Sequence, residues 1–310
     1  VAAFFGGVPL PRPATSTPQR ITLAVDDPDA EMDGGDDVAD ADPTVQVRFS
    51  RVETLRHKDF AAYDDDELAE AWAQMDRLAL VGAPRPSRRS VPTRGVRGRP
   101  DLRRTVRHAL RTGGEPIRRP RTERGVRFRR VVLLVDVSGS MSPYADALLR
   151  LAHRFATAGG VSTSSTTRGV EVFTVGTRLT RVTRAMRLRD ADRAIVAAGE
   201  TVPDWSGGTR LGETLRIFLD RWGQRGLARG SVVVIFSDGW ERGDTALLGE
   251  QMRRLHGLAH RVIWVNPHVG KDGYQPVQAG IVAVLAHVDD FVAGHSMATF
   301  AELVEVVGDA

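Results

Sequence analysis

The sequence predicts an α/β fold, a three-layer, doubly wound, mostly parallel sheet preceded by an N-terminal helical extension. Three observations predict this class. Unbroken apolar runs at 131–135 and 231–236 are typical of strands buried on both faces of a parallel sheet. Segments with apolar residues at helical spacing alternate with these runs, which indicates strands joined by helices. Both runs also end in short acidic turns rich in Gly and Ser, at the edge where such sheets place ligands.

Two helices are expected in the extension. The first begins with the acidic residues 64–67 and ends near Gly82, and the second runs from Asp101 to Thr112 before Gly113 and Gly114. The apolar stripe of the first helix consists of Leu68, Trp72, Met75 and Leu78. We expect both helices to pack against the main domain.

The main domain is expected to continue with alternating elements. Ser142 and Pro143 begin a helix, because Ser caps helices and Pro is favoured at the first helical position. Further helices are marked by stripes at 211–222, 248–255 and 297–307, and the helix after Ser142 by the residues Leu148, Leu151, Ala152 and Phe155. Strands are expected at 170–174, 179–183, 262–265 and 281–285, with 179–183 at a sheet edge because arginines surround it.

Composition limits the class of protein. With 310 residues, 42% of them hydrophobic, the chain can bury one sizeable core and a smaller appendage. The absence of Cys excludes thiol catalysis, disulfides and thiolate metal sites. No apolar run reaches the roughly 18 residues of a spanning helix, and residues 1–10 do not resemble a secretory signal. We therefore expect a cytoplasmic protein, with peripheral membrane association as an open alternative.

The net charge of +4 conceals two oppositely charged segments. Residues 26–42 are acidic with few apolar side chains, so we expect them to be disordered. Residues 84–130 contain seventeen arginines and three acids. This basic segment is interpreted as a solvated arm that meets an acidic protein surface, with nucleic acid or an acidic membrane as the alternative. Phe128 is its only aromatic residue, which disfavours stacking on bases.

Five oxygen-bearing side chains form a candidate metal site. Asp136, Ser138 and Ser140 follow the first apolar run, and Asp238 follows the second. Thr209 lies between the two runs, after the Gly-rich turn 205–208. Such oxygen ligands suit a hard cation, and we expect Mg²⁺, with Mn²⁺ or Ca²⁺ as alternatives. The competing interpretation is that Ser138 and Ser140 only cap the next helix.

Catalytic signatures are weak. A metal-dependent hydrolase needs a general base, and the histidines at 153, 256, 260, 268, 287 and 295 all lie outside the metal-site segments. Residues 207–214 approach a phosphate-binding loop but place Glu213 where the phosphate-binding Lys is required. The sequence therefore favours a protein that is not an enzyme.

The five residues match, one by one, the metal-ion-dependent adhesion site of von Willebrand factor A (VWA) domains, which have a Rossmann-like fold. This resemblance covers about 129–310. A closer resemblance, to the CoxE-like family, is carried by Glu53-Thr-Leu-Arg-His-Lys-Asp-Phe60, by 101–104 and 111–116, by Asp136-Val-Ser-Gly-Ser-Met141, and by Trp264-Val-Asn-Pro267 with Gly273-Tyr274. We accordingly expect an acidic N-terminus (1–44), a helical, Arg-rich extension (45–128) and a VWA domain (129–310).

The CoxE resemblance implies a prokaryotic accessory protein that works with a MoxR-type AAA+ ATPase. In some systems the client enzyme is a molybdenum-containing carbon monoxide dehydrogenase. The resulting hypothesis is a non-catalytic adaptor whose metal ion is completed by an acidic side chain of a partner. The alternatives are an RNA-binding VWA protein that uses its Arg-rich arm and a metal-dependent hydrolase.

Overall fold

The computed structural model describes residues 51–78, 83–115, 119–158, 169–202, 208–270 and 278–310. Its centre is a six-stranded sheet, ordered β6-β5-β4-β7-β8-β9, in which only β6 runs antiparallel to its neighbour. The strands are β4 (Val131–Asp136), β5 (Glu171–Val175), β6 (Thr180–Arg181), β7 (Val232–Phe236), β8 (Arg261–Asn266) and β9 (Asp290–Ala293). The predicted α/β class with a mostly parallel sheet is confirmed.

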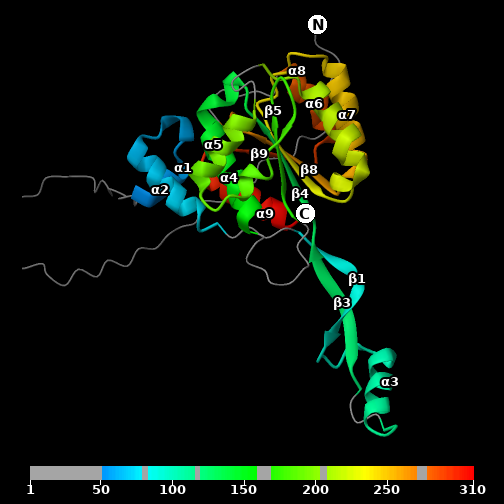
Figure 1. Cartoon of the computed structure of the whole chain (residues 1–310). Helices are drawn as coiled ribbons and strands as arrows, with labels where there is room; N and C mark the ends of the chain where they lie inside the picture. Colours follow the sequence, from blue (N-terminus) through cyan, green and yellow to red (C-terminus); the bar gives the residue numbers. More distant parts are fainter. Residues whose placement is uncertain (1–50, 79–82, 116–118, 159–168, 203–207, 271–277) are drawn as a thin grey trace, which may run out of the picture. The chain divides into compact units, whose positions relative to one another are not determined.

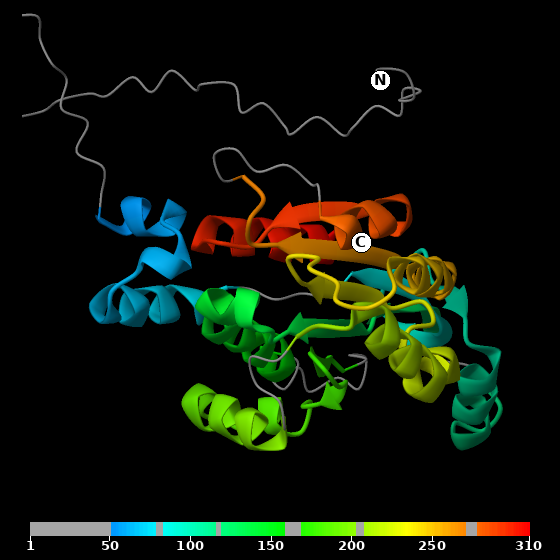
Figure 2. The ribbon, with the colours of Figure 1, turned by 90° about the horizontal axis from the view of Figure 1, so that it is seen from above.

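Helices cover both faces of this sheet (Figure 1 and Figure 2). One face carries α4 (Ser142–Ala158), α5 (Ala191–Thr201) and α9 (Met297–Gly308), and the other carries α6 (Leu211–Phe218), α7 (Thr245–Leu258) and α8 (Ala279–Val284). Alternate residues of β4 enter the two cores: Val131, Leu133 and Val135 face α4, whereas Val132 and Leu134 face α6 and α7. This alternation explains why a strand buried on both faces is apolar throughout.

The N-terminal helices pack on the α4 and α9 side. They are α1 (Arg51–His57), the short 3₁₀ helix η1 (Phe60–Ala62) and α2 (Asp65–Met75). The Phe60 ring lies 4.9 Å from that of Phe300, and the Phe60 N–H donates to the His295 carbonyl at 2.8 Å. Asp64 caps α2 by accepting from the Glu67 N–H, as the acidic start predicted. The expected helix end at Gly82 lies outside the described residues.

A separate three-stranded sheet forms the arm, which we define as residues 84–128. Strand β1 (Pro84–Thr93) pairs antiparallel with β3 (Arg121–Phe128), which also pairs with β2 (Arg99–Pro100). Helix α3 (Leu102–Arg111) lies between β2 and β3 in sequence and at the far end of the hairpin (Figure 1). Asp101 caps it by accepting from the Arg104 N–H at 3.0 Å, as expected from the sequence.

Two expectations are wrong, and the strands of the arm were not predicted. The two helices expected in the extension are present as α2 and α3, but the extension also contains β1, β2 and β3, whose exposed, Arg- and Pro-rich sequence lacks the apolar alternation that marks a strand. No residue of α3 is buried, so it does not pack on the main domain as we expected. The predicted strand 281–285 falls in α8 and in the first residue of the 3₁₀ helix η5 (Leu285–His287); Ile281 and Val284 of α8 face the core at helical spacing, and the sheet is completed by β9 instead. So short an apolar run does not distinguish the two periods.

The predicted edge strand is present as β6, while α5, capped by Asp190, has no counterpart among the predicted elements. The acidic segment 26–42 and residues 159–168 and 203–207 lie outside the described residues. No helix in the described part of the chain has both the length and the apolar character needed to cross a bilayer.

Candidate metal centre

The candidate site lies where β4 and β7 end. These strands are parallel neighbours in register, with Val135 opposite Phe236, so Asp136 and the segment 237–238 lie at the same sheet edge. Both acidic turns therefore follow neighbouring strands at one edge of the sheet, as the parallel-sheet prediction implies. Asp136, Ser138, Thr209 and Asp238 are all buried, with at most 5% of each residue exposed, whereas Ser140 is exposed.

Asp136 is the centre of the local hydrogen-bond network. Its Oδ1 atom accepts from the Thr209 hydroxyl at 2.9 Å and from the Ser138 N–H at 2.9 Å. Its Oδ2 atom accepts from the Ser237 hydroxyl at 2.7 Å. One carboxylate therefore joins the loops that follow β4 and β7 to the loop that precedes α6.

Ser138 and Ser140 lie side by side in the turn after β4. Their hydroxyl oxygens are 3.2 Å apart. The turn is the 3₁₀ helix η2 (Gly139–Met141), and the Ser138 side chain makes no capping hydrogen bond to it. For Ser138, this observation disfavours the alternative that its hydroxyl is present only as a helix cap.

Asp238 occupies the same edge with different partners. Its Oδ1 atom accepts from the Trp240 N–H at 3.0 Å. Within the described residues no hydrogen bond joins the Asp238 side chain to those of the other four predicted ligands. The backbone next to it must bend sharply: Gly239 has φ 78°, and a Cβ there would lie 2.3 Å from Ile281 Cδ1.

Burial gives Asp136 a strong preference for a nearby cation. Removal from water raises the pKa of its carboxyl to about 6, although the hydrogen bonds from Ser237, Ser138 and Thr209 act in the opposite direction. A buried carboxylate is costly in the charged state unless an opposite charge balances it. The donors around it are oxygens, the ligand type that suits Mg²⁺, Mn²⁺ or Ca²⁺.

A metal held here would need hydroxyl ligands. The described residues contain no group of three or more His, Cys, Asp or Glu side chains that could hold an ion. The five predicted residues supply two carboxylates and three hydroxyls. The structure brings four of these residues into contact: Asp136 accepts from the Thr209 hydroxyl and from the Ser138 backbone N–H, and the Ser138 hydroxyl lies against that of Ser140. The residues present therefore fit a hard cation at this edge.

Sequence reasoning missed three residues of the site. Ser237 holds Asp136, and its position directly after an apolar run and before Asp238 was the available signal. Trp240 and Arg242 line the hollow above the serines, together with Ser138, Gly139, Ser140, Gly208 and Thr209. Trp240 is 66% exposed, which is unusual for so large a side chain. No sequence period marks Trp240 or Arg242, because both lie in a loop.

Arg242 is held against the Gly-rich loop. The Arg242 backbone N–H donates to the Thr209 carbonyl at 3.1 Å. The Arg242 side chain lies so close to Gly208 that a Cβ on this glycine would be 2.6 Å from Arg242 Cδ. The carboxylate of the neighbouring Glu241 accepts from the Gly212 N–H at 2.9 Å, and this hydrogen bond connects the loop after β7 to α6. The loop after β7 therefore presents a cation and an aromatic ring at the rim of the hollow.

Comparison with known proteins gives one family match. Residues 72–300 match the family model described as VWA domain containing CoxE-like protein. No curated protein matches the chain.

Three of the solved structures with a similar fold have low sequence identity to this chain. The von Willebrand factor type A protein from Catenulispora acidiphila is 15% identical, with 60% of this chain and 43% of that chain covered and a TM-score of 0.42. Proximal thread matrix protein 1 from the mussel byssus, with a zinc-occupied MIDAS motif, is 15% identical (58% and 46% covered, TM-score 0.40). The manganese-loaded Plasmodium vivax TRAP protein is 16% identical (58% and 71% covered, TM-score 0.39). The chain spans less than half the length of the first two.

Proposed function

Because the chain belongs to the family of VWA domain containing CoxE-like proteins, we propose that it is a non-catalytic, metal-dependent protein-interaction adaptor. Asp136, Ser138, Ser140, Thr209 and Asp238 are its proposed metal ligands, and Mg²⁺ is the expected ion. The observation that carries this proposal is the buried Asp136 carboxylate, which accepts hydrogen bonds from Thr209, Ser138 and Ser237 on three different loops.

The ligand set explains how such a site would recognise a protein. Neutral hydroxyls donate less charge than carboxylates, so the ion keeps much of its positive charge. Ser140 is exposed and Ser138 lines the hollow, so the site opens to solvent on this side. An Asp or Glu of a partner would complete the coordination shell there, and Arg242 would attract the same acidic side chain.

The partners proposed here rest on the family resemblance. They are a MoxR-type AAA+ ATPase, which would hydrolyse ATP, and a client enzyme of the type exemplified by molybdenum-containing carbon monoxide dehydrogenase. We propose 129–310 as the adaptor domain, 45–128 as its extension and 1–44 as a separate acidic segment.

Titration calorimetry with MgCl₂ and MnCl₂ tests the metal site directly. Asp136→Asn keeps the shape of the side chain but removes the charged ligand, so metal affinity should fall at least about a hundredfold. Glu250→Gln on the exposed face of α7 is the matched control and should bind normally. Equal affinity of Asp136→Asn and the wild type would contradict the proposed ligand set.

Capture of the MoxR-type ATPase from the same organism tests the adaptor role. We expect capture in Mg²⁺ and its loss in EDTA or on Asp136→Asn substitution. Capture that is equal under all three conditions would remove the metal from the interaction, even if the metal site itself is real.

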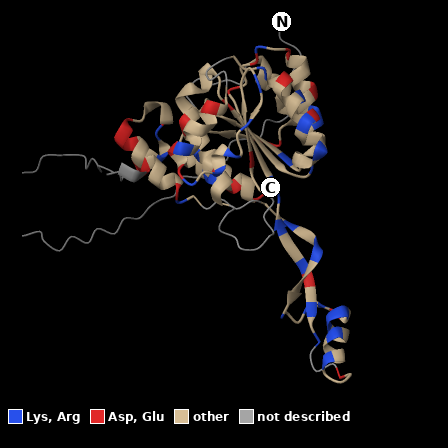
Figure 3. Cartoon of the chain, in the orientation of Figure 1, with Lys and Arg blue, Asp and Glu red and all other residues tan. Residues whose placement is uncertain are grey.

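Two alternative functions have their own tests. A hydrolase would turn over p-nitrophenyl phosphate in Mg²⁺ or Mn²⁺, yet none of the described residues that line the hollow is a His, Glu or Lys that could serve as general base. An RNA-binding protein is favoured by the arginines of the arm (Figure 3) and would purify with bound nucleic acid.

A further inference from the structure

Helix α3 exposes an apolar stripe that nothing in the described part of the chain covers. Leu102 is 73% exposed, Val106 is 58% exposed and Leu110 is 78% exposed. These residues are spaced by four, so they lie along one face of the helix. Three large aliphatic side chains exposed in a row are typical of an interaction surface rather than of a solvated helix.

The helix is nevertheless well formed at both ends. Asp101 caps its start, and the Asp101 N–H donates to the Pro120 carbonyl at 2.8 Å, which fixes α3 to the strand that follows. At its end the Gly114 N–H donates to the Ala109 carbonyl at 2.8 Å, and both Gly113 and Gly114 have positive φ. A ten-residue helix is marginal by itself, so these caps hold the stripe in a fixed geometry.

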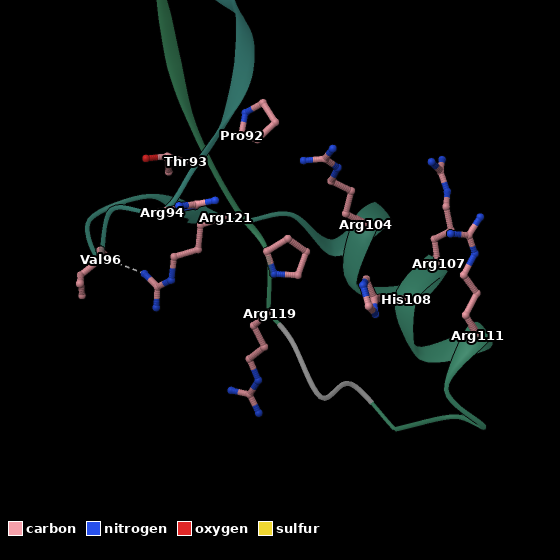
Figure 4. A pocket seen from close by; sticks show the side chains of 11 residues that line it. Pro92, Thr93, Arg94, Val96, Arg104, Arg107, His108, Arg111, Arg119 and Arg121 are labelled. Atoms are coloured by element: carbon pink, nitrogen blue, oxygen red, sulfur yellow. Dashed lines mark hydrogen bonds between the residues drawn. The ribbon is translucent and has the colours of Figure 1, made fainter.

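Arginines flank the stripe on one side. At 100° per residue, Arg103 lies next to the stripe, Arg107 lies between the stripe and the opposite face, and Arg104 and Arg111 lie on that opposite face. Figure 4 shows Arg104, Arg107 and Arg111 extending from α3 in the same direction. The hollow between α3 and the hairpin is lined by eight further residues, of which Arg94, Arg119 and Arg121 are basic and none is acidic.

These observations distinguish between three kinds of anionic partner. Nucleic acid would use the arginines but leave the aliphatic stripe in water, and no Phe, Tyr or Trp side chain lines the basic hollow to stack on bases. Helices that lie in a membrane interface usually add Trp or Phe to the apolar face, which α3 lacks. An apolar protein groove with an acidic rim would satisfy both the stripe and its neighbouring arginines.

We propose that α3 is a docking helix. Its Leu102, Val106 and Leu110 side chains enter an apolar groove of a partner protein, and acidic residues on the rim of that groove pair with Arg103 and Arg107. This contact is separate from the metal site and needs no metal ion. The chain would thereby hold a partner at two chemically different places, one metal-dependent and one apolar and salt-sensitive.

The test uses the full chain and three probes: Ca²⁺-loaded calmodulin as an acidic protein with apolar grooves, phosphatidylserine vesicles, and a single-stranded poly(U) RNA. We expect calorimetric binding to calmodulin. The triple variant Leu102→Ser/Val106→Ser/Leu110→Ser should weaken it at least about a hundredfold, because three aliphatic side chains no longer leave water. Arg103→Gln/Arg107→Gln should weaken it about tenfold.

Matched controls separate these effects from damage to the fold. Val282→Ser removes a 61% exposed aliphatic side chain from α8, and Arg193→Gln/Arg253→Gln removes two exposed charges outside the arm; both should bind like the wild type. The melting temperature of the stripe variant should be unchanged, because its three side chains are exposed. Binding to RNA or vesicles without calmodulin, binding to none of the probes, or calmodulin binding that survives the stripe variant would overturn the proposal.

Discussion

Helices α7 and α3 have similar apolar stripes and opposite surroundings. In α7, Leu248, Met252 and Leu255 are fully buried against the central sheet, whereas the three corresponding side chains of α3 are more than half exposed. Both helices are capped by an Asp at the residue before the helix. The comparison teaches that a helical apolar period identifies a face that needs a partner, but not whether that partner belongs to the same chain.

Aliphatic truncation gives the largest expected contrast between the two helices. Leu255→Ala should lower the free energy of unfolding by about 2–5 kcal/mol, because it leaves a cavity in a packed core. Val106→Ala in α3 should change it by less than about 0.5 kcal/mol. Urea denaturation of both variants measures the difference; equal losses would mean that α3 is covered within the chain after all.

A pair of threonines extends the comparison to polar groups. Thr209→Val removes the hydroxyl that donates to the buried Asp136, so we expect a loss of about 1–3 kcal/mol in unfolding free energy and weaker metal binding. Thr105→Val removes a hydroxyl that donates to the Asp101 carbonyl in the exposed arm, and should cost under about 1 kcal/mol without affecting the metal. Calorimetry and urea denaturation check both, and unchanged metal affinity in Thr209→Val would remove Thr209 from the ligand set.

The two proposed contacts should also respond differently to pH. A metal binds the ionised Asp136, whose pKa is raised to about 6, so metal affinity should fall about tenfold per pH unit as the pH drops below about 6. The stability of the metal-free protein should move the other way. Because the folded pKa exceeds the ordinary value of 3.8, protonation stabilises the fold as the pH falls from about 6 towards about 4.

Calorimetry with Mg²⁺ at a series of pH values measures the first effect. The arginines next to the α3 stripe keep their charge at these pH values. Binding of the arm to the calmodulin probe should therefore not show the fall in affinity that is expected for the metal. A metal affinity that does not change with pH would show that no group titrating near 6 takes part.

Salt should give the smallest effect. Here the arm, rather than the metal site, should be the more sensitive of the two. Raising NaCl from about 0.05 M to about 0.5 M should weaken arm binding several-fold, because Arg103 and Arg107 are exposed and their pairs with rim acids are screened. The buried Asp136 should be screened much less, so metal affinity should change little. Surface plasmon resonance with the immobilised calmodulin probe measures the first quantity. Salt-independent arm binding would mean that the arginines contribute nothing.

Much of the fold could be predicted from the sequence, because local sequence patterns specify many of its strands and helix starts. The apolar runs of β4 and β7 are strands, and the acidic caps Asp64 and Asp101 begin helices where predicted. The hairpin β1–β3 could not be predicted, since a strand exposed on both faces has no apolar alternation. The segment 281–285 was assigned the wrong period because five apolar residues satisfy a strand and a helix equally well.

The sequence by itself determined which side chains could form the site: Asp136 and Asp238 each follow a buried run, and that order in the chain is sufficient to place them at strand ends. Only the tertiary structure decided that β4 and β7 are parallel neighbours, that Ser237 holds Asp136, and that Trp240 and Arg242 border the hollow. For α3, the sequence contains the apolar stripe, but only the tertiary structure shows that the stripe is exposed. The physical reason is that amphipathic periods and caps are local, whereas burial and neighbourhood depend on contacts between residues far apart in the chain.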